Sequence, residues 1–357
     1  MENDFTSWLA ENFSPANDKT ILGIGDDAAL LASPSEPNPP TTSSLLPREQ
    51  QLTVVSTDLL SDKVDFLVKD ISPVAIGYKA ASVSLSDIAA MGALPLSMTV
   101  AIALEKKNSS PPFNSNRKTD QGSNGTPIQD LNFAKEIYTG IKESLRPFGV
   151  DLVGGDTNYH YGPLTICTTA IGTVSSKNVW RRSGAQKGDL LVVTGRLGGS
   201  LLGHHLNFRP RVAEATRIAQ TTNIHAAIDI SDGLAIDTSR LATASHLGAV
   251  LDLSKIPVSD SAVLLSRQIS TMSVVDPQKG KGAIEHALYD GEDFELLLAL
   301  SPDSAEDLFT KLANEIPLTT IGYFTDRPGL WEGRLDEQNC SKKELAPLPI
   351  DGFLHSL

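Results

Sequence analysis

Apolar and polar residues alternate along the chain with two different periods. Apolar side chains follow a helical spacing within residues 131–149, at Leu131, Ala134, Ile137, Ile141 and Leu145. Apolar runs of strand length occur at 51–58, 96–104, 151–158, 164–174, 189–195, 226–231, 249–257 and, after an acidic turn, within 287–300. The segment 73–93 begins at a proline and has Ala-rich helical character around Tyr78 to Val83, and further helices are predicted at 211–222 and 231–248. Because strands and helices interleave in both halves, the pattern predicts a mixed α/β protein.

Two stretches interrupt this pattern. Residues 33–51 are rich in Ser, Pro and Thr, and residues 106–129 are polar with repeated Asn, Ser, Gly and Pro. Neither stretch could bury enough apolar surface to offset the entropy lost on ordering. We therefore expect two mobile surface insertions, with a lid over a site as the alternative interpretation.

The length of the chain favours two domains. Its 357 residues, of which 40% are hydrophobic and 20% charged, exceed the usual size of one domain and can form a large core. A basic, glycine-containing segment at 180–189 separates the two halves of the pattern. We therefore predict domains at residues 1–178 and 179–357.

Composition and charge argue against several classes of protein. The net charge of −13, with no evident basic face, argues against nucleic-acid binding. No apolar run approaches the length of a membrane span, and the acidic N-terminus lacks an apolar signal core. We therefore expect a cytoplasmic protein without a membrane partner. Cys167 and Cys340 are far apart in sequence and indicate neither a disulfide framework nor a zinc site.

Short apolar runs end in carboxylates six times along the chain. The acidic residues are Asp26, Asp27, Asp58, Asp87, Asp156, Asp229, Asp232, Asp290, Glu292 and Asp293. One such residue is explained by a turn or a helix N-cap, and Asp87 and Asp232 suit the N-cap position. Six repeats indicate more than turns and N-caps, because strand ends often share one edge of a sheet, where their carboxylates can converge. Carboxylates gathered there would repel one another unless cations neutralised them.

These ligand types favour magnesium and a phosphorylated substrate. Carboxylates without Cys or His suit Mg²⁺ or Mn²⁺, and Mg²⁺ commonly bridges carboxylates to phosphates. Glycines in the motifs GIGDD and GGD, beside Asp26 and Asp156, would let the backbone approach a phosphate closely. The sequence contains no P-loop, no GxSxG nucleophile elbow and no protein-kinase motifs. The pattern therefore predicts phosphoryl transfer at an aspartate-bound magnesium site of another architecture.

Nine motifs together resemble the thiamine-monophosphate kinases, a family within the aminoimidazole ribonucleotide synthetase-like superfamily. In chain order they are GIGDDAAL, STDLLSDKVDF, YKAASVSLSDIAAMGALP, VGGDTN, RRSGAQKGD, VTGRLGGSLLG, AIDISDGLAIDTSRLA, GEDFELLLA and DGF. Each motif by itself is weak evidence for the family, but nine motifs in the family's order are highly specific evidence. They cover nearly the whole chain outside the two insertions.

The resemblance implies a fold and an activity. The N-terminal half resembles an α/β domain whose strands join those of a partner in a β-barrel, so that the protein is a homodimer. The C-terminal half resembles a second α/β domain, with the nucleotide between the two. The implied reaction moves a phosphoryl group from ATP to thiamine monophosphate, with several Mg²⁺ ions, and yields thiamine diphosphate.

The resemblance also implies roles for individual residues. The implied magnesium ligands are Asp27, Ser56, Thr57, Asp58, Asp87, Asp156, Asp229 and Asp232. The implied nucleotide contacts are Gly155, Asp156, Arg182 and Ser231, and Glu292 and Phe353 match positions that touch the thiamine part of the substrate. The acceptor phosphate is already anionic near neutral pH, so no general base is assigned and Arg182 helps to balance phosphate charge.

Two aspartates fall outside this scheme. Asp65 stands where the family usually has a substrate-contacting His, so it is either a substrate contact, favourable beside a cationic thiazolium ring, or a solvated loop residue. Asp237 has no assigned role and is expected on a solvated helix face. Two alternatives to the kinase stay open: a catalytically inactive, nucleotide-binding regulatory member of the superfamily, and a related ATP-dependent enzyme with another substrate.

Overall fold

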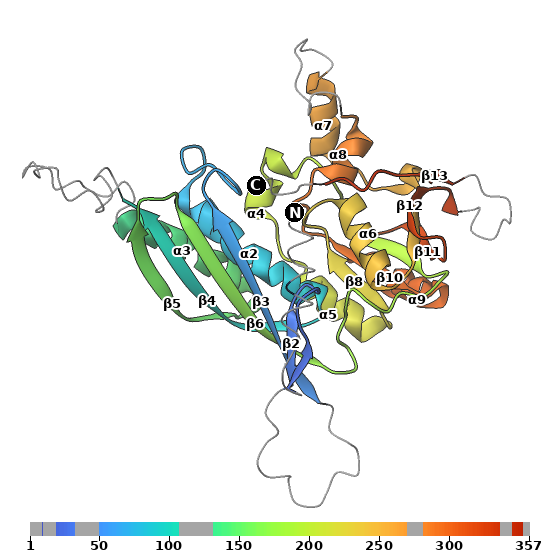
Figure 1. The fold of residues 1–357 in the computed structure, drawn as a ribbon, viewed down its shortest axis with the longest axis horizontal. Helices are drawn as coiled ribbons and strands as arrows, with labels where there is room; N and C mark the ends of the chain where they lie inside the picture. The colour runs from blue at the N-terminus through green and yellow to red at the C-terminus, as the bar shows by residue number, and fades with distance from the viewer. Residues whose placement is uncertain are drawn as a thin grey trace, which may run out of the picture. The chain divides into compact units, whose positions relative to one another are not determined.

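The chain forms two β-sheets with helices packed on them, as the mixed α/β pattern predicts (Figure 1). The computed structural model describes residue 9 and residues 19–32, 50–106, 131–269, 281–335 and 345–352. The predicted insertions at 33–51 and 106–129 lie almost entirely outside the described residues. Contacts divide the chain into two compact units, one of Thr57–Ser84 and Leu96–Ala170, the other of Met1–Ser56, Leu85–Pro95 and Ile171–Leu357.

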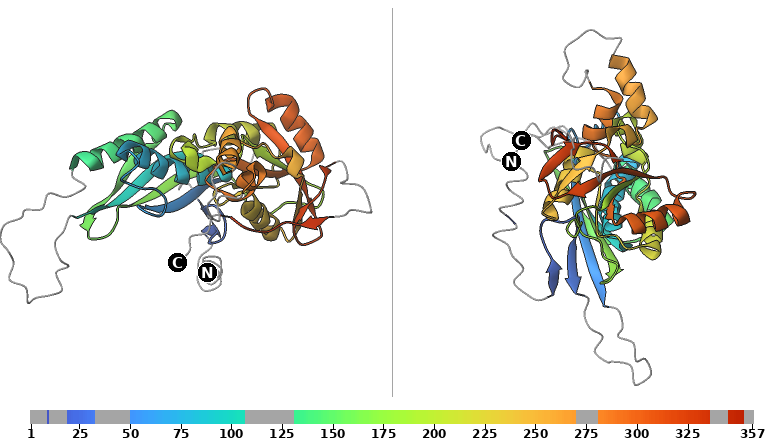
Figure 2. Two further views of the ribbon diagram at one scale, coloured as in Figure 1. Left: turned by 90° about the horizontal axis from the view of Figure 1, so that it is seen from above. Right: turned by 90° about the vertical axis from the view of Figure 1, so that its right-hand side faces the viewer.

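The first sheet has six strands in the order β1-β2-β3-β6-β4-β5. Their bounds are Thr20–Leu22 (β1), Ala29–Ala32 (β2), Gln51–Ser61 (β3), Leu94–Glu105 (β4), Asp151–His160 (β5) and Thr165–Ser175 (β6). Every second residue of β6 is buried, which is the pattern of a strand covered on one face. Helices α2 (Pro73–Ala90) and α3 (Leu131–Leu145) lie on that face (Figure 2).

Helices α2 and α3 approach each other through glycines. A Cβ on Gly77 would lie 1.9 Å from the carbonyl oxygen of Ile137, and a Cβ on Gly140 would lie 1.8 Å from that of Val74. Ala134, Ile137, Ile141 and Leu145 of the predicted helical stripe are buried, whereas Leu131 at the start of α3 is 63% exposed.

The second sheet has seven strands in the order β13-β12-β9-β11-β7-β10-β8. Their bounds are Leu190–Thr194 (β7), Ala226–Asp229 (β8), Gly248–Leu251 (β9), Leu296–Leu300 (β10), Leu318–Thr325 (β11), Gly329–Glu332 (β12) and Ala346–Pro347 (β13). Every residue of β8, β9 and β10 is buried, so both faces of the sheet are covered at these three strands. Helices α6 (Leu234–Ala244) and α8 (Ala283–Tyr289) pack together, while α9 (Pro302–Leu312) packs on β7 and on α5 (Val212–Thr221).

Short elements connect these layers. They are α4 (His204–Asn207), α7 (Asp260–Ile269) and the 3-10 turns η1 (Arg146–Phe148), η2 (Ser200–Leu202) and η3 (Leu253–Lys255). The glycine-rich segment after β7 therefore leads into one 3-10 turn and one short helix. No helix among the described residues is both long enough and apolar enough to cross a membrane.

The predicted strands and long helices are confirmed, but four acidic residues do not lie where the pattern put them. Asp58 and Asp156 lie within β3 and β5 rather than at strand ends, because the hydrogen-bonded ladder continues past them. Asp87 is not an N-cap: it lies in the last turn of α2, a helix that had begun at Pro73. Asp232 precedes the residue at the N-cap of α6, which is Gly233.

Candidate active site

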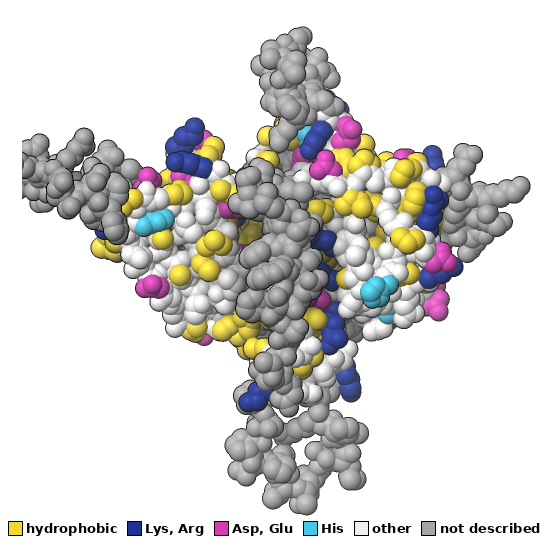
Figure 3. Space-filling view, in the orientation of Figure 1, with side chains coloured by type: hydrophobic (Ala, Val, Ile, Leu, Met, Phe, Trp, Pro, Cys, Tyr) yellow, Lys and Arg dark blue, Asp and Glu magenta, His cyan; other side chains and the backbone are white. Residues whose placement is uncertain are grey.

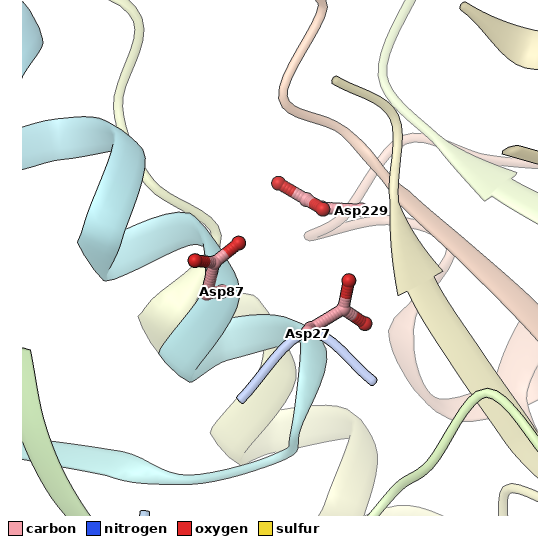
Figure 4. Close-up of side chains that lie close together, drawn as sticks. All are labelled: Asp27, Asp87 and Asp229. Atoms are coloured by element: carbon pink, nitrogen blue, oxygen red, sulfur yellow. The ribbon is translucent and has the colours of Figure 1, made fainter. Parts of the chain in front are cut away.

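Three carboxylates that are remote in sequence converge at one place. Asp27, Asp87 and Asp229 each offer an oxygen atom, and these atoms lie within 4.8 Å of one another (Figure 4). Asp27 lies in the turn between β1 and β2, Asp87 in the last turn of α2, and Asp229 is the last residue of β8. Asp27 and Asp229 are buried, with 8% and 3% of their surface exposed. The structure thus brings together three of the eight predicted magnesium ligands.

Hydroxyl groups orient two of these carboxylates. Ser86 Oγ donates a hydrogen bond of 2.5 Å to Asp229 Oδ2, and Ser56 Oγ donates one to Asp87 Oδ2. Burial, and then the charge of Asp27, raise the pKa of Asp229 well above its ordinary value. The charged form of the cluster is therefore costly unless cations neutralise it.

Arg182 supplies part of the neutralising charge. Its Nε and terminal nitrogen donate to Asp27 Oδ1 over 3.1 and 2.5 Å, and its backbone N–H donates to the Asp26 carboxylate over 3.0 Å. Burial opposes the charge of Arg182, but Asp27, Asp26 and Asp229 outweigh burial and raise the pKa of its guanidinium. At Asp26, burial and then the neighbouring Asp27 raise the pKa to about 6.

The donor set fits a divalent cation. Asp27 Oδ2 is buried and accepts no hydrogen bond from any described residue, which leaves one uncompensated oxygen within the cluster. Three carboxylates without a thiolate or imidazole form a hard oxygen donor set. Asp27, Asp87 and Asp229 can therefore hold Mg²⁺ or Mn²⁺.

The loop that follows β8 carries two further predicted residues, Ser231 and Asp232. One terminal nitrogen of Arg240 donates both to Asp232 Oδ2 and, over 2.8 Å, to Asp237 Oδ1. Asp237 Oδ2 accepts the backbone N–H groups of Ser231, Asp232 and Gly233 over 3.0–3.2 Å.

The expectation of a solvated Asp237 was wrong. Its side chain is fully buried, because the loop folds back over the first turn of α6 and aims three N–H groups at it. Burial, and then the charge of Asp232, raise the pKa of Asp237 to about 7, against the opposing effect of Arg240.

The backbone of Glu292 joins the same loop. Its N–H donates to the Ser231 carbonyl over 2.6 Å, and its carboxylate lies 3.0 Å from His205 Nδ1. The φ angle of Glu292 is +56°, an uncommon value for a residue other than glycine. Gly352 approaches the Asp232 carbonyl so closely that a Cβ there would lie 2.5 Å away. Phe353, the next residue, lies outside the described part of the chain.

Three predicted residues lie in the unit of Thr57–Ser84 and Leu96–Ala170, at or near the second half of β3. Thr57 Oγ1 lies 2.8 Å from Thr169 Oγ1. Asp58 accepts a hydrogen bond of 2.5 Å from Ser84 Oγ, and burial raises the pKa of its carboxyl. Asp65 accepts the Ser61 backbone N–H over 2.7 Å and so stabilises the turn after β3.

Gly155 and Asp156 lie on β5, the edge strand of the same sheet. Gly155 has φ +154°, and a Cβ there would lie 1.8 Å from the Val100 carbonyl oxygen on β4. Asp156 Oδ1 accepts the N–H of Thr157 over 2.9 Å. Strands β6 and β4 separate Asp156 from Asp58, so the sheet does not bring these two predicted ligands together.

Three residues of the site were missed by the sequence analysis: Ser86, Asp237 as a structural group, and Arg240. Asp237 and Arg240 are three residues apart on a helix, a spacing at which opposite charges meet, and this signal could have indicated the pair. No sequence signal identified Ser86, because its contact with Asp229 spans 143 residues.

Two family models together match most of the chain. A family model described as AIR synthase related protein, N-terminal domain, matches residues 25–174, and the corresponding C-terminal domain model matches residues 170–331. A thiamine-monophosphate kinase of Rhodopirellula baltica is 38% identical over 332 residues, which span 93% of this chain and 92% of that relative.

Solved structures share the fold. The thiamine-monophosphate kinase of Stenotrophomonas maltophilia K279a is 28% identical, with a TM-score of 0.61 over 92% of this chain and 94% of its own. A structure of AaThiL complexed with AMPPCP and TMP is 22% identical, with a TM-score of 0.71 over 96% of both chains. The relatives match over nearly their full length, and the chain belongs to the thiamine-monophosphate kinase family.

Proposed function

We propose that this chain transfers the γ-phosphoryl group of ATP to the phosphate of thiamine monophosphate. The bond between the γ-phosphorus and its bridging oxygen breaks, and a bond from an acceptor phosphate oxygen to that phosphorus forms. The products are ADP and thiamine diphosphate. Relatives named thiamine-monophosphate kinase, up to 38% identical, support this reaction.

The observation that carries the proposal is the cluster of Asp27, Asp87 and Asp229. These carboxylates come from three separate segments, and Asp27 keeps a buried oxygen that accepts no hydrogen bond within the described part of the chain. Mg²⁺ held there would neutralise phosphate charge as the phosphoryl group moves. Ser56 and Ser86 hold two of the carboxylates in place, and Arg182 adds a fixed positive charge beside Asp27.

The chain's own residues would otherwise bind and orient the substrates. Arg182, Ser231, Gly155 and Asp156 are the proposed nucleotide contacts, and the metal set extends to Ser56, Thr57, Asp58, Asp156 and Asp232. No residue needs to remove a proton, because the acceptor phosphate is anionic near neutral pH. Positioning and charge neutralisation therefore supply the catalysis.

The thiamine end of the substrate is assigned to Glu292, Asp65 and Phe353. A carboxylate beside a thiazolium cation is favourable, and Glu292 is held close to the proposed nucleotide residue Ser231 by a backbone hydrogen bond. Asp65, which accepts the Ser61 N–H in the turn after β3, is the second carboxylate proposed to face the thiazolium ring.

The active form is proposed to be a homodimer. The β5 edge strand is exposed along nearly its whole length, and Leu59, Leu96 and Val153 of this sheet are 52–64% exposed. Figure 3 shows hydrophobic side chains among uncharged ones, with few charges, over the strands of this sheet. Pairing with the strands of a second copy, in a shared barrel, would cover this surface.

One assay tests the reaction. Purified protein is incubated with ATP, Mg²⁺ and thiamine monophosphate, and ADP and thiamine diphosphate are measured. Asp229→Asn should lower turnover at least about 100-fold, because it removes one negative charge from the cluster that would hold the phosphate-neutralising Mg²⁺. Asp260→Asn, which changes an exposed aspartate of α7, is the matched control and should keep normal turnover.

Other outcomes point to the alternatives. ATP binding without turnover would favour the regulatory, inactive member of the superfamily. Phosphorylation of thiamine but not of thiamine monophosphate, or of another acceptor only, would contradict the proposed substrate.

A further inference from the structure

The loop Ser231–Gly233 is held by a network that no role in the proposed reaction explains. All three of its backbone N–H groups donate to one oxygen, Asp237 Oδ2, over 3.0–3.2 Å. Asp237 is fully buried in the first turn of α6, where the helix dipole also favours a carboxylate. This single side chain therefore fixes the backbone direction from which Ser231 and Asp232 project.

The other oxygen of Asp237 holds Arg240. One terminal nitrogen of Arg240 donates to Asp237 Oδ1 and to Asp232 Oδ2, so one cationic group bridges two carboxylates. The side chains of Arg240 and Asp232 are 23% and 25% exposed, whereas that of Asp237 is fully covered. The contact between Arg240 and Asp232 is therefore the more accessible half of the bridge.

We propose that Asp237 and Arg240 are a positioning pair for Asp232, in which Arg240 occupies the place of a divalent cation until the cation arrives. The inference rests on the proposed function, in which Asp232 is a metal ligand. Asp237 orders the loop in the absence of metal, and Arg240 neutralises Asp232 so that this carboxylate stays oriented. A cation that binds Asp232 must share or displace the guanidinium.

The two residues of the pair therefore affect cation affinity in opposite directions. Arg240→Gln leaves Asp232 without its counter-charge, so a cation meets a more negative site and should bind several-fold more tightly. Asp237→Asn weakens the anchor of three backbone N–H groups and releases Arg240 from one of its acceptors, so the cation should bind about tenfold more weakly. If Asp237 and Arg240 only supported the fold, both substitutions would weaken cation binding.

Binding of Mn²⁺ to the full-length protein, measured by calorimetry and by electron paramagnetic resonance without nucleotide, tests the proposal. Asp232→Asn identifies the class of sites that depends on Asp232. In the Asp232→Asn background Arg240→Gln should have no further effect on Mn²⁺ affinity. Arg240→Lys keeps the charge and should restore affinity close to that of the wild type. Arg217→Gln, whose guanidinium pairs with Glu315 elsewhere, is the matched control.

The measured changes in Mn²⁺ affinity either support or overturn the proposal. Tighter binding in Arg240→Gln and weaker binding in Asp237→Asn support it, whereas unchanged or weaker binding in Arg240→Gln overturns it. If Asp237→Asn does not fold, the sign of the change in Arg240→Gln decides alone. Because Mn²⁺ binding is measured without substrate, absence of thiamine monophosphate kinase activity would contradict the proposed function and leave this result standing.

Discussion

At the scale of single residues, buried carboxylates in this chain differ in the groups that surround them. Asp237 and Asp293 accept backbone N–H groups, which are fixed in place by the fold. Asp27, Asp87 and Asp229 face one another, with two serine hydroxyls and Arg182 around them. The first kind holds a loop through backbone N–H groups, whereas carboxylates of the second kind repel one another unless added positive charge neutralises them.

Asp293 gives a pH-dependent prediction. Its carboxylate accepts the Gly198 N–H and the Ser200 hydroxyl, yet burial raises its pKa to about 8. The folded state therefore binds a proton that the unfolded state has released, at every pH between the ordinary value near 4 and 8. The free energy of unfolding should fall as pH rises through this window, by up to about 1.4 kcal/mol per unit.

The asparagine in Asp293→Asn cannot release a proton, so this variant should lack the pH-dependent contribution of Asp293 to the free energy of unfolding. Urea unfolding of both proteins at several values between pH 5 and pH 8 measures it. The difference in stability should shift in favour of the variant as pH rises. Parallel pH profiles for the two proteins would contradict the raised pKa.

At the scale of elements, glycines decide how closely strands and helices approach. Gly77 and Gly140 let α2 and α3 meet at backbone distance, and Gly155 lets β5 pair with β4. These positions lie within helices and strands, where glycine otherwise costs stability. Their presence there is explained by the space that is missing for a Cβ.

Gly155→Ala tests this for the edge strand. The new Cβ would lie 1.8 Å from the Val100 carbonyl oxygen, and the φ angle of +154° adds strain, so β5 must move away from β4. We expect a loss of about 2–4 kcal/mol in the free energy of unfolding, measured with urea. Gly154→Ala is the matched control, because no atom lies within 4 Å of its Cβ position and its φ is not positive. Equal losses in both variants would refute the steric explanation.

At the scale of the whole molecule, the two aspartates proposed as metal ligands on the first sheet bear on how the protein assembles. Asp58 on β3 and Asp156 on β5 are separated by β6 and β4. Three strand spacings of about 4.8 Å give about 14 Å, which is too far for one cation to bridge. If both carboxylates serve one site, we expect Asp156 to come from the second copy of a homodimer.

Mixing two inactive variants tests this arrangement. Asp58→Asn and Asp156→Asn should each be inactive, but co-refolded in equal amounts they should recover up to about one quarter of wild-type activity. Half of all dimers contain one chain of each variant, and each of these mixed dimers keeps one intact site of two. A mixture without activity, from dimers shown by light scattering to have exchanged chains, would place both carboxylates in one subunit's site.

Much of the candidate site could be predicted because its residues lie in short, ordered motifs. Asp27, Asp87, Asp229 and Arg182 were all identified from sequence, and the structure brings them together. Their elements were harder to assign. Asp87 suited a helix start by its local sequence, but the helix had begun at Pro73, and only packing determines how far a helix continues.

The sequence by itself determined the mixed α/β class, most strands and helices, and the acidic residues available for a metal. Those properties depend on local periodicity and on side-chain chemistry, both of which are written along the chain. Tertiary structure alone decided that Asp237 is buried beneath a loop and that Ser86 meets Asp229 across 143 residues. Burial and long-range contacts depend on which elements pack together, and the local sequence pattern does not predict that packing.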